Sequence, residues 1–160
     1  MILETSSTWK HFQARFAEWF NAFVMMMWGA YVILHPGMFT DPRLNALWTG
    51  LLNVATQQTW GLIALLNGTI RVGALYVNGQ HKRTPSIRLV ASFVSAFIWT
   101  QIVLGMWNGG VPNTGLVIYP CLILADIYSA FRAGADATYV ARRDQRVEAE
   151  LRSGTLVSRS

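Results

Sequence analysis

Ionisable side chains within long apolar segments are the first candidates for chemistry in this sequence. Such a side chain is costly to place in a membrane, so it marks a function or a specific partner. Asp126 is the carboxylate that lies inside an apolar run. It could bind a proton or a cation, but we favour an ion pair with a base at the same membrane edge. The expected partners are Arg71, Arg88 and Arg132.

The other reactive side chains form no recognisable site. The three histidines, His11, His35 and His81, lie in separate segments, whereas haem held between helices needs two histidines at similar depth. Cys121 is the single cysteine, which excludes internal disulfides and multi-cysteine metal sites. The sequence has no zinc-protease, nucleophile-elbow or phosphate-loop motif. We therefore predict that the chain is not an enzyme and carries neither a cofactor nor a metal.

Uncharged polar side chains in the apolar segments suit contacts between helices. Asn53 and Gln57 are four residues apart, which places them on one face of a helix. Thr100 and Gln101 lie in a later segment, and Gln57 and Gln101 are each about 20 Å from the expected inner edge. We predict that Gln57 and Gln101 face each other across a helix pair or a subunit interface. A polar pore lining is the alternative.

The composition indicates that lipid surrounds much of the chain. Apolar residues make up 52% of the 160 residues and charged residues 13%. That charged share is about half of the roughly 25% found in typical globular domains. A water-soluble surface needs more charge than this. The composition therefore argues against a soluble enzyme, a disulfide-rich extracellular mini-protein and a disordered tail.

Four apolar segments are long enough to cross a hydrocarbon layer, which takes about 20 helical residues. They are apolar nearly all round, whereas a water-soluble helix has one polar face. We predict an all-α integral membrane protein, in which residues 1–135 form a four-helix transmembrane domain and residues 136–160 a basic cytoplasmic tail. The predicted spans are residues 19–36, 45–70, 88–107 and 114–131. The second is longer than a span needs, which indicates tilt or extension past one membrane face.

The basic residues define the predicted orientation. Of the thirteen lysines and arginines, only Arg43 falls on the opposite side of a four-span topology from the rest. Basic residues concentrate on the cytoplasmic side, so both termini and the central loop are expected there. At that face they would meet anionic lipid headgroups. Since no nucleic-acid-binding module accompanies them, we expect no nucleic-acid partner.

The segments that flank the predicted transmembrane domain are also expected to be helical. Residues 8–18 are expected to form a short amphipathic helix in the headgroup layer, or else to extend the first span. The tail after Arg132 is expected to be helical. Tryptophan favours the membrane interface, and four tryptophans lie near the expected span ends. The predicted interfacial anchors are Trp9, Trp19, Trp48 and Trp107.

Four short stretches resemble small multi-pass membrane proteins of bacteriophages and prophages. These are RVGALYVNG from Arg71, RTPSIR from Arg83, WTQIVLG from Trp99 and ADIYSAFRAGAD from Ala125. The likeness covers residues 71–136. That family has no established activity, so the resemblance implies a bacterial inner membrane and transfers no catalytic residue.

Three functions are consistent with these features. The first is a structural or interaction protein of the inner membrane, which assembles through transmembrane helix contacts with a second copy or another membrane protein. The second is a holin-like protein that oligomerises and permeabilises the membrane. The third is a small transporter or channel subunit, against which the scarcity of buried charges and of discontinuous helices argues.

Overall fold

The described part of the chain is built from helices that pair in two antiparallel sets. The computed structural model describes residues 15–77, 84–110 and 113–152. The predicted amphipathic helix at 8–18 lies mostly outside these residues. The helices are α2 (Phe16–Leu34), α3 (Asn45–Leu52), α4 (Gln57–Tyr76), α5 (Thr84–Asn108) and α6 (Gly115–Arg152). The all-α prediction is confirmed for the described residues.

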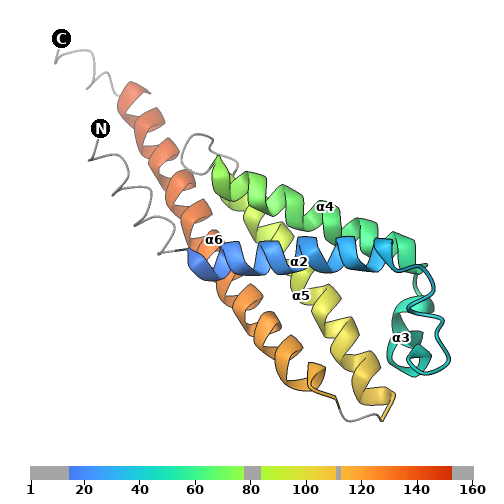
Figure 1. Ribbon diagram of the computed structural model, residues 1–160. Coiled ribbons are helices and arrows are strands. Elements are labelled where there is room, and N and C mark those ends of the chain that lie inside the picture. The colour runs from blue at the N-terminus through green and yellow to red at the C-terminus, as the bar shows by residue number, and fades with distance from the viewer. Residues whose placement is uncertain (1–14, 78–83, 111–112, 153–160) are drawn as a thin grey trace, which may run out of the picture.

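The two pairs are α2 with α4 and α5 with α6, and these pairs make the most extensive contacts in the fold. The α2–α4 pair lies across the α5–α6 pair (Figure 1). The short helix α3 packs beside the second half of α5, close to the end of α2 (Figure 1). This arrangement brings the start of α2, the end of α4 and the start of α5 toward the middle of α6.

Glycines allow α2 and α4 to touch backbone to backbone. A Cβ atom placed on Gly29 of α2 would lie 2.3 Å from the backbone nitrogen of Leu65. A Cβ atom on Gly68 of α4 would lie 2.5 Å from the backbone nitrogen of Met26. No side chain fits at either distance. Close approach through small residues is how helices associate in lipid, where hydrophobic burial offers no driving force.

The predicted second span, residues 45–70, is not one helix. The chain leaves the helical path after Leu52 and starts α4 at Gln57, with Thr56 as its N-cap. The Thr56 side chain accepts a hydrogen bond from the backbone N–H of Thr59, and Trp60 Nε1 donates to the carbonyl oxygen of Leu51 at 2.8 Å. The Thr56 bond caps one of the N–H groups that the start of α4 leaves without a helical partner, and the Trp60 bond joins α4 to the end of α3.

The fourth predicted span and the tail form one continuous helix. α6 runs from Gly115 to Arg152, through the predicted span end at residue 131 and the predicted domain boundary at 135–136. The helical tail is confirmed as far as Arg152. Its last turns extend beyond the other helices (Figure 1), and nearly all their residues are exposed.

The interior of the bundle combines an apolar core with several buried polar and charged side chains, and many large apolar residues lie on the outside. By length and hydropathy, α2, α5 from Pro85 and α6 can each cross a membrane. α4 is less apolar because it carries Gln57, Asn67 and Arg71, yet all three are buried. Its exposed large apolar residues include Leu62, Ile63, Leu66 and Ile70.

Candidate functional site: a buried arginine–carboxylate network

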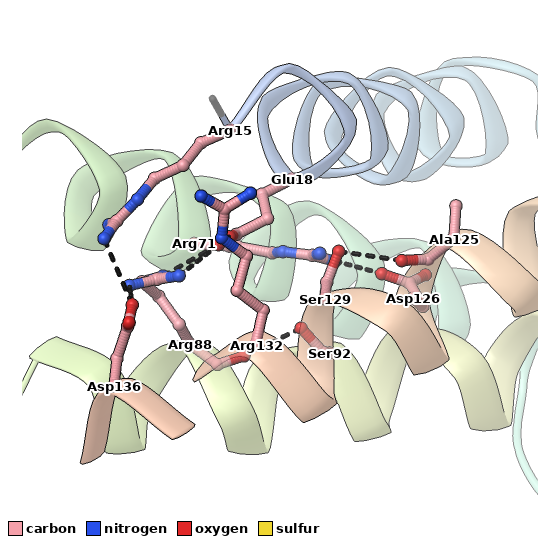
Figure 2. A network of polar contacts seen from close by, with 10 residues as sticks. All are labelled: Arg15, Glu18, Arg71, Arg88, Ser92, Ala125, Asp126, Ser129, Arg132 and Asp136. Carbon is pink, nitrogen blue, oxygen red and sulfur yellow. Dashed lines mark hydrogen bonds and ion pairs between the residues drawn. The ribbon is translucent and has the colours of Figure 1, made fainter. Parts of the chain in front are cut away.

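Charged side chains from four parts of the chain meet where the two helix pairs cross (Figure 2). They come from the start of α2, the end of α4, the start of α5 and the middle of α6. Because α2, α4, α5 and α6 each bring at least one charge to the same place, the fold itself assembles the site. We call the following residues the charge network: Arg15, Glu18, Arg71, Arg88, Asp126, Arg132 and Asp136.

Arg88 of α5 lies at the centre of one half of the network. Its Nε and Nη2 atoms donate to Glu18 Oε2 at 2.8 and 2.5 Å. Its Nη1 atom donates to Asp136 Oδ2 at 3.1 Å, and Arg15 donates to the same oxygen at 3.1 Å (Figure 2). Arg132 Nε lies 3.8 Å from Glu18 Oε1. One buried guanidinium therefore connects α2, α5 and α6.

Arg71 of α4 and Asp126 of α6 form the other half. Arg71 Nη1 donates to Asp126 Oδ1, and both side chains are buried. Asp126 follows Gly115 by eleven residues, about 17 Å along α6. Arg71 follows Gln57 by fourteen residues, about 21 Å along α4. Each charge therefore lies far from the first residue of its own helix, and both side chains are buried inside the bundle.

The surroundings of this ion pair are polar but incompletely hydrogen-bonded. Asn21 of α2 and Trp99 of α5 lie close to the Asp126 carboxylate. Asp126 Oδ2, Arg71 Nε, Arg71 Nη2 and Trp99 Nε1 are buried and have no hydrogen-bond partner in the described part of the chain. Trp99 also packs against Tyr119, with ring centroids 5.4 Å apart. An unsatisfied buried group is costly, so this pair depends strongly on its own contact.

The chemistry open to the network is electrostatic positioning. Four arginines face three carboxylates, and each carboxylate contacts at least one arginine. The pKa of Arg15, which lies just before α2, is lowered mainly by its partial burial and to a lesser extent by repulsion from the positive charge of Arg88. Removing one member of a buried ion pair typically costs about 3–5 kcal/mol, because the other charge is left unpaired. The network therefore makes one arrangement of the helices strongly preferred.

The ion pair expected for Asp126 is formed, and its partner is Arg71. Arg88 and Arg132 contact Glu18 instead, and Arg88 also contacts Asp136. Sequence reasoning missed Arg15, Glu18 and Asp136 as members of the network. The available signal was position, because all three lie at expected inner helix ends, where buried arginines require carboxylates.

Within the chain, Gln57 does not pair with Gln101, which corrects the contact expected across a helix pair. Gln57 Nε2 donates to the carbonyl oxygens of Val32 at 2.8 Å and His35 at 2.7 Å. Gln57 Oε1 accepts from the backbone N–H of Phe39 at 3.0 Å. The last carbonyls of α2 have no partner within their own helix, and Gln57 supplies one. Its role is to join α4 to the end of α2 and the loop that follows.

The other polar residues expected at helix contacts have lesser roles. Asn53 is exposed in the break after α3, so it does not share a helix face with Gln57. Thr100 Oγ1 donates to the carbonyl oxygen of Ala96 in its own helix at 2.7 Å. Gln101 is half-buried on α5. These three positions therefore contribute less to helix pairing than their sequence spacing indicated.

Asn67 makes the polar contact between α4 and α5 that sequence reasoning did not identify. Its Nδ2 atom donates to the carbonyl oxygen of Ala91 at 3.1 Å and to Ser95 Oγ at 2.8 Å. All three residues are buried. The small side chains at Ala91 and Ser95 let α4 approach α5 closely enough for these bonds.

Two of the expected tryptophan anchors lie on the surface and one does not. Trp107 is 73% exposed, and Trp19 is half-buried with its ring stacked on Phe23. Trp48 is only 6% exposed and stacks on Phe39, with centroids 4.6 Å apart. Trp48 is therefore a core residue and not an exposed anchor. Trp9 lies outside the described residues.

The fold and the site define a class but no family. The described residues form an all-α fold, and three of its helices are long and apolar enough to cross a membrane, which is typical of the multi-pass membrane class. In residues 15–77, 84–110 and 113–152, no group of three or more histidine, cysteine or acidic side chains is placed to hold a metal ion. Comparisons with family models, curated proteins and solved structures find no match.

Proposed function

We propose that this chain is a four-span protein of the bacterial inner membrane with a structural or interaction role rather than an enzymatic one. α4 is proposed as a span in addition to α2, α5 and α6, because several of its polar side chains face the protein and many of its large apolar side chains face outward. Gln57, Asn67 and Arg71 are buried, whereas Leu62, Leu66 and Ile70 are exposed. The mean hydropathy of α4 is low because it averages the buried polar face with the exposed apolar face, so α4 is not selected by hydropathy alone. The resemblance of residues 71–136 to phage and prophage proteins supports a phage origin.

The charge network supports an orientation with both ends in the cytoplasm. The start of α2, the end of α4 and the start of α5 lie together in the network. Three consecutive crossings that alternate in direction would produce this arrangement. The basic residues flanking these ends favour the cytoplasmic side.

The observation that carries the structural role is that the charged side chains pair with one another inside a single chain. A transporter or an aqueous pore needs polar groups that face a pathway or a second subunit. Here Arg71, Arg88, Glu18 and Asp126 are fully buried against partners of opposite charge. The outer surface left for assembly is apolar, which suits contact with lipid, a second copy or another membrane protein.

Two measurements test this proposal in bacterial cells. Alkaline phosphatase fused after residue 110 should be active, and the same enzyme fused after residue 160 should be inactive, because it folds only outside the cytoplasm. Induced expression should leave growth and the membrane potential unchanged. Rapid collapse of the potential would identify a holin-like function instead, and solute uptake by proteoliposomes would identify a transporter.

Assembly can be tested through Cys121, which is exposed on α6. Mild oxidation of membranes should yield a disulfide-linked dimer if a second copy packs along this face, and the Cys121→Ser variant is the matched control. A chain that stays monomeric and recovers no membrane partner after cross-linking at lysines would contradict an interaction role.

A further inference from the structure

The side of the α5–α6 pair that faces away from the protein core carries an apolar groove of about 480 Å³. Phe93 of α5 and Phe131 of α6, exposed by 61% and 77%, form its rim. Ala130 is buried and Gly134 half-buried, so small residues form its floor. The lining residues are Leu89, Phe93, Ile127, Ala130, Phe131, Gly134, Ala135 and Thr138.

The lining offers nothing for recognition of a polar solute. Thr138 is the one lining residue with a polar side chain, and its Oγ1 atom already donates to the carbonyl oxygen of Gly134 at 2.9 Å. The size falls within the roughly 300–1,000 Å³ of small-molecule sites. The shape and chemistry therefore suit a flexible hydrocarbon chain.

The groove lies at the depth of one membrane leaflet. Ile127 and Thr138 follow Gly115 by 12 and 23 residues, which places them about 18 and 35 Å along α6. If Gly115 lies at the outer edge of a hydrocarbon layer about 30 Å thick, the groove occupies the cytoplasmic half and ends at the headgroup level.

A positive charge continues the groove at this end. Ile127, Phe131, Gly134 and Thr138 form one stripe on α6, and the next positions on that face are Ala141 and Arg142, three and four residues after Thr138. Arg142 is exposed. An apolar groove that ends in an arginine at headgroup depth has the chemical complement of an anionic phospholipid.

We propose that this groove holds an acyl chain of an anionic phospholipid of the cytoplasmic leaflet, with Arg142 contacting its phosphate. This site rests on the membrane placement proposed above. It assigns a specific, structurally defined partner to a surface that otherwise meets bulk lipid. A tightly held lipid would also fix α5 against α6 at the end where the charge network lies.

Native mass spectrometry of the full chain, released from nanodiscs of equal parts phosphatidylglycerol and phosphatidylcholine, tests the site. Ala135→Trp fills the groove, and Ala149→Trp makes the same change at an exposed position outside it. Arg142→Gln removes the proposed phosphate contact, and Arg143→Gln removes the same charge from another side of the helix. Size-exclusion profiles establish that each variant is folded, and the two arginine variants decide the result if Ala135→Trp aggregates.

The wild-type chain should retain phosphatidylglycerol in preference to phosphatidylcholine. Ala135→Trp should lose the retained lipid, and Arg142→Gln should lower the preference about fivefold, as expected for one basic contact at the membrane surface. Ala149→Trp and Arg143→Gln should behave like the wild type. The proposal is overturned if Ala135→Trp retains lipid as the wild type does, if Arg142→Gln matches Arg143→Gln, or if the wild type is a lipid-free dimer that Ala135→Trp dissociates.

These outcomes are separable from failure of the proposed function. A chain that is absent from the membrane fraction would refute the membrane placement itself. A chain that is inserted in the membrane, with groove variants that retain lipid normally, would refute only the lipid site.

Discussion

Arg71 and Asp126 form a buried ion pair although 55 residues separate them in the sequence. Arg71 lies near the end of α4 and Asp126 in the first third of α6, so the pair joins the two antiparallel helix sets. Burying two charges is expensive, and their attraction repays that cost only while both are present. The pair therefore selects one arrangement of the helices more than it adds stability.

Asp126→Ala should abolish most of the folded yield. The change leaves the Arg71 guanidinium buried without a carboxylate, at a cost of about 3–5 kcal/mol. The yield of monodisperse protein in detergent measures the effect. Glu148→Ala is the control, because Glu148 pairs with Arg152 in an exposed contact that contributes about 1 kcal/mol or less.

A double variant separates charge from packing at this site. Arg71→Leu combined with Asp126→Leu removes both charges, and replacing a buried ion pair with apolar residues is often neutral or stabilising. The folded yield should therefore recover relative to Asp126→Ala. If the double variant is as poorly folded as Asp126→Ala, then the packing or hydrogen bonds of Arg71 and Asp126, and not only their charge balance, are needed for folding.

Gln57→Ala should lower the free energy of unfolding by about 1–3 kcal/mol, because the buried carbonyl of Val32 and the buried N–H of Phe39 lose their partner. It should also expose the loop after α2 to limited proteolysis. Gln58 is the adjacent exposed glutamine, so Gln58→Ala should change little. Thermal unfolding in detergent compares the two variants, and equal melting temperatures would contradict the role of Gln57.

Gly29→Ala should destabilise the α2–α4 pair. Its Cβ atom would lie 2.3 Å from the backbone nitrogen of Leu65, so the helices must separate, and such overpacking typically costs about 1–3 kcal/mol. Gly73→Ala is the matched control, since a Cβ atom there meets nothing within 4 Å. That control should gain up to about 1 kcal/mol of helix stability. A Gly29→Ala variant as stable as the wild type would refute the close contact.

Trp48→Ala should cost about 3–5 kcal/mol, as for other buried large aromatic residues. Trp107→Ala should leave the melting temperature nearly unchanged, because that side chain is mostly exposed. The same unfolding measurement applies to both. An equal, small effect of the two substitutions would contradict the core position of Trp48 and support its role as an interfacial anchor.

The α-helical class and the candidate membrane crossings were readable from the sequence, because they depend on local properties. An apolar run of about 20 residues can form a helix that lipid accepts. The run at residues 45–70 is interrupted after Leu52, whereas the other three of the four predicted runs lie in such helices. The same holds for the helical tail, which the structure extends to Arg152. Asp126 could be identified as a site residue since a charge in an apolar run is visible without a structure.

Partner choice was decided only by tertiary structure. Sequence left three arginines open for Asp126, and packing of α4 against the rest of the bundle selects Arg71. The break between Leu52 and Gln57 was hidden because its residues are as uncharged as the helices around it, and the hydrogen bonds that stabilise it come from Thr56 and Trp60. The sequence shows which charged and polar side chains need a partner when they are buried. The crossing of the two helix pairs determines which side chains are close enough to be that partner.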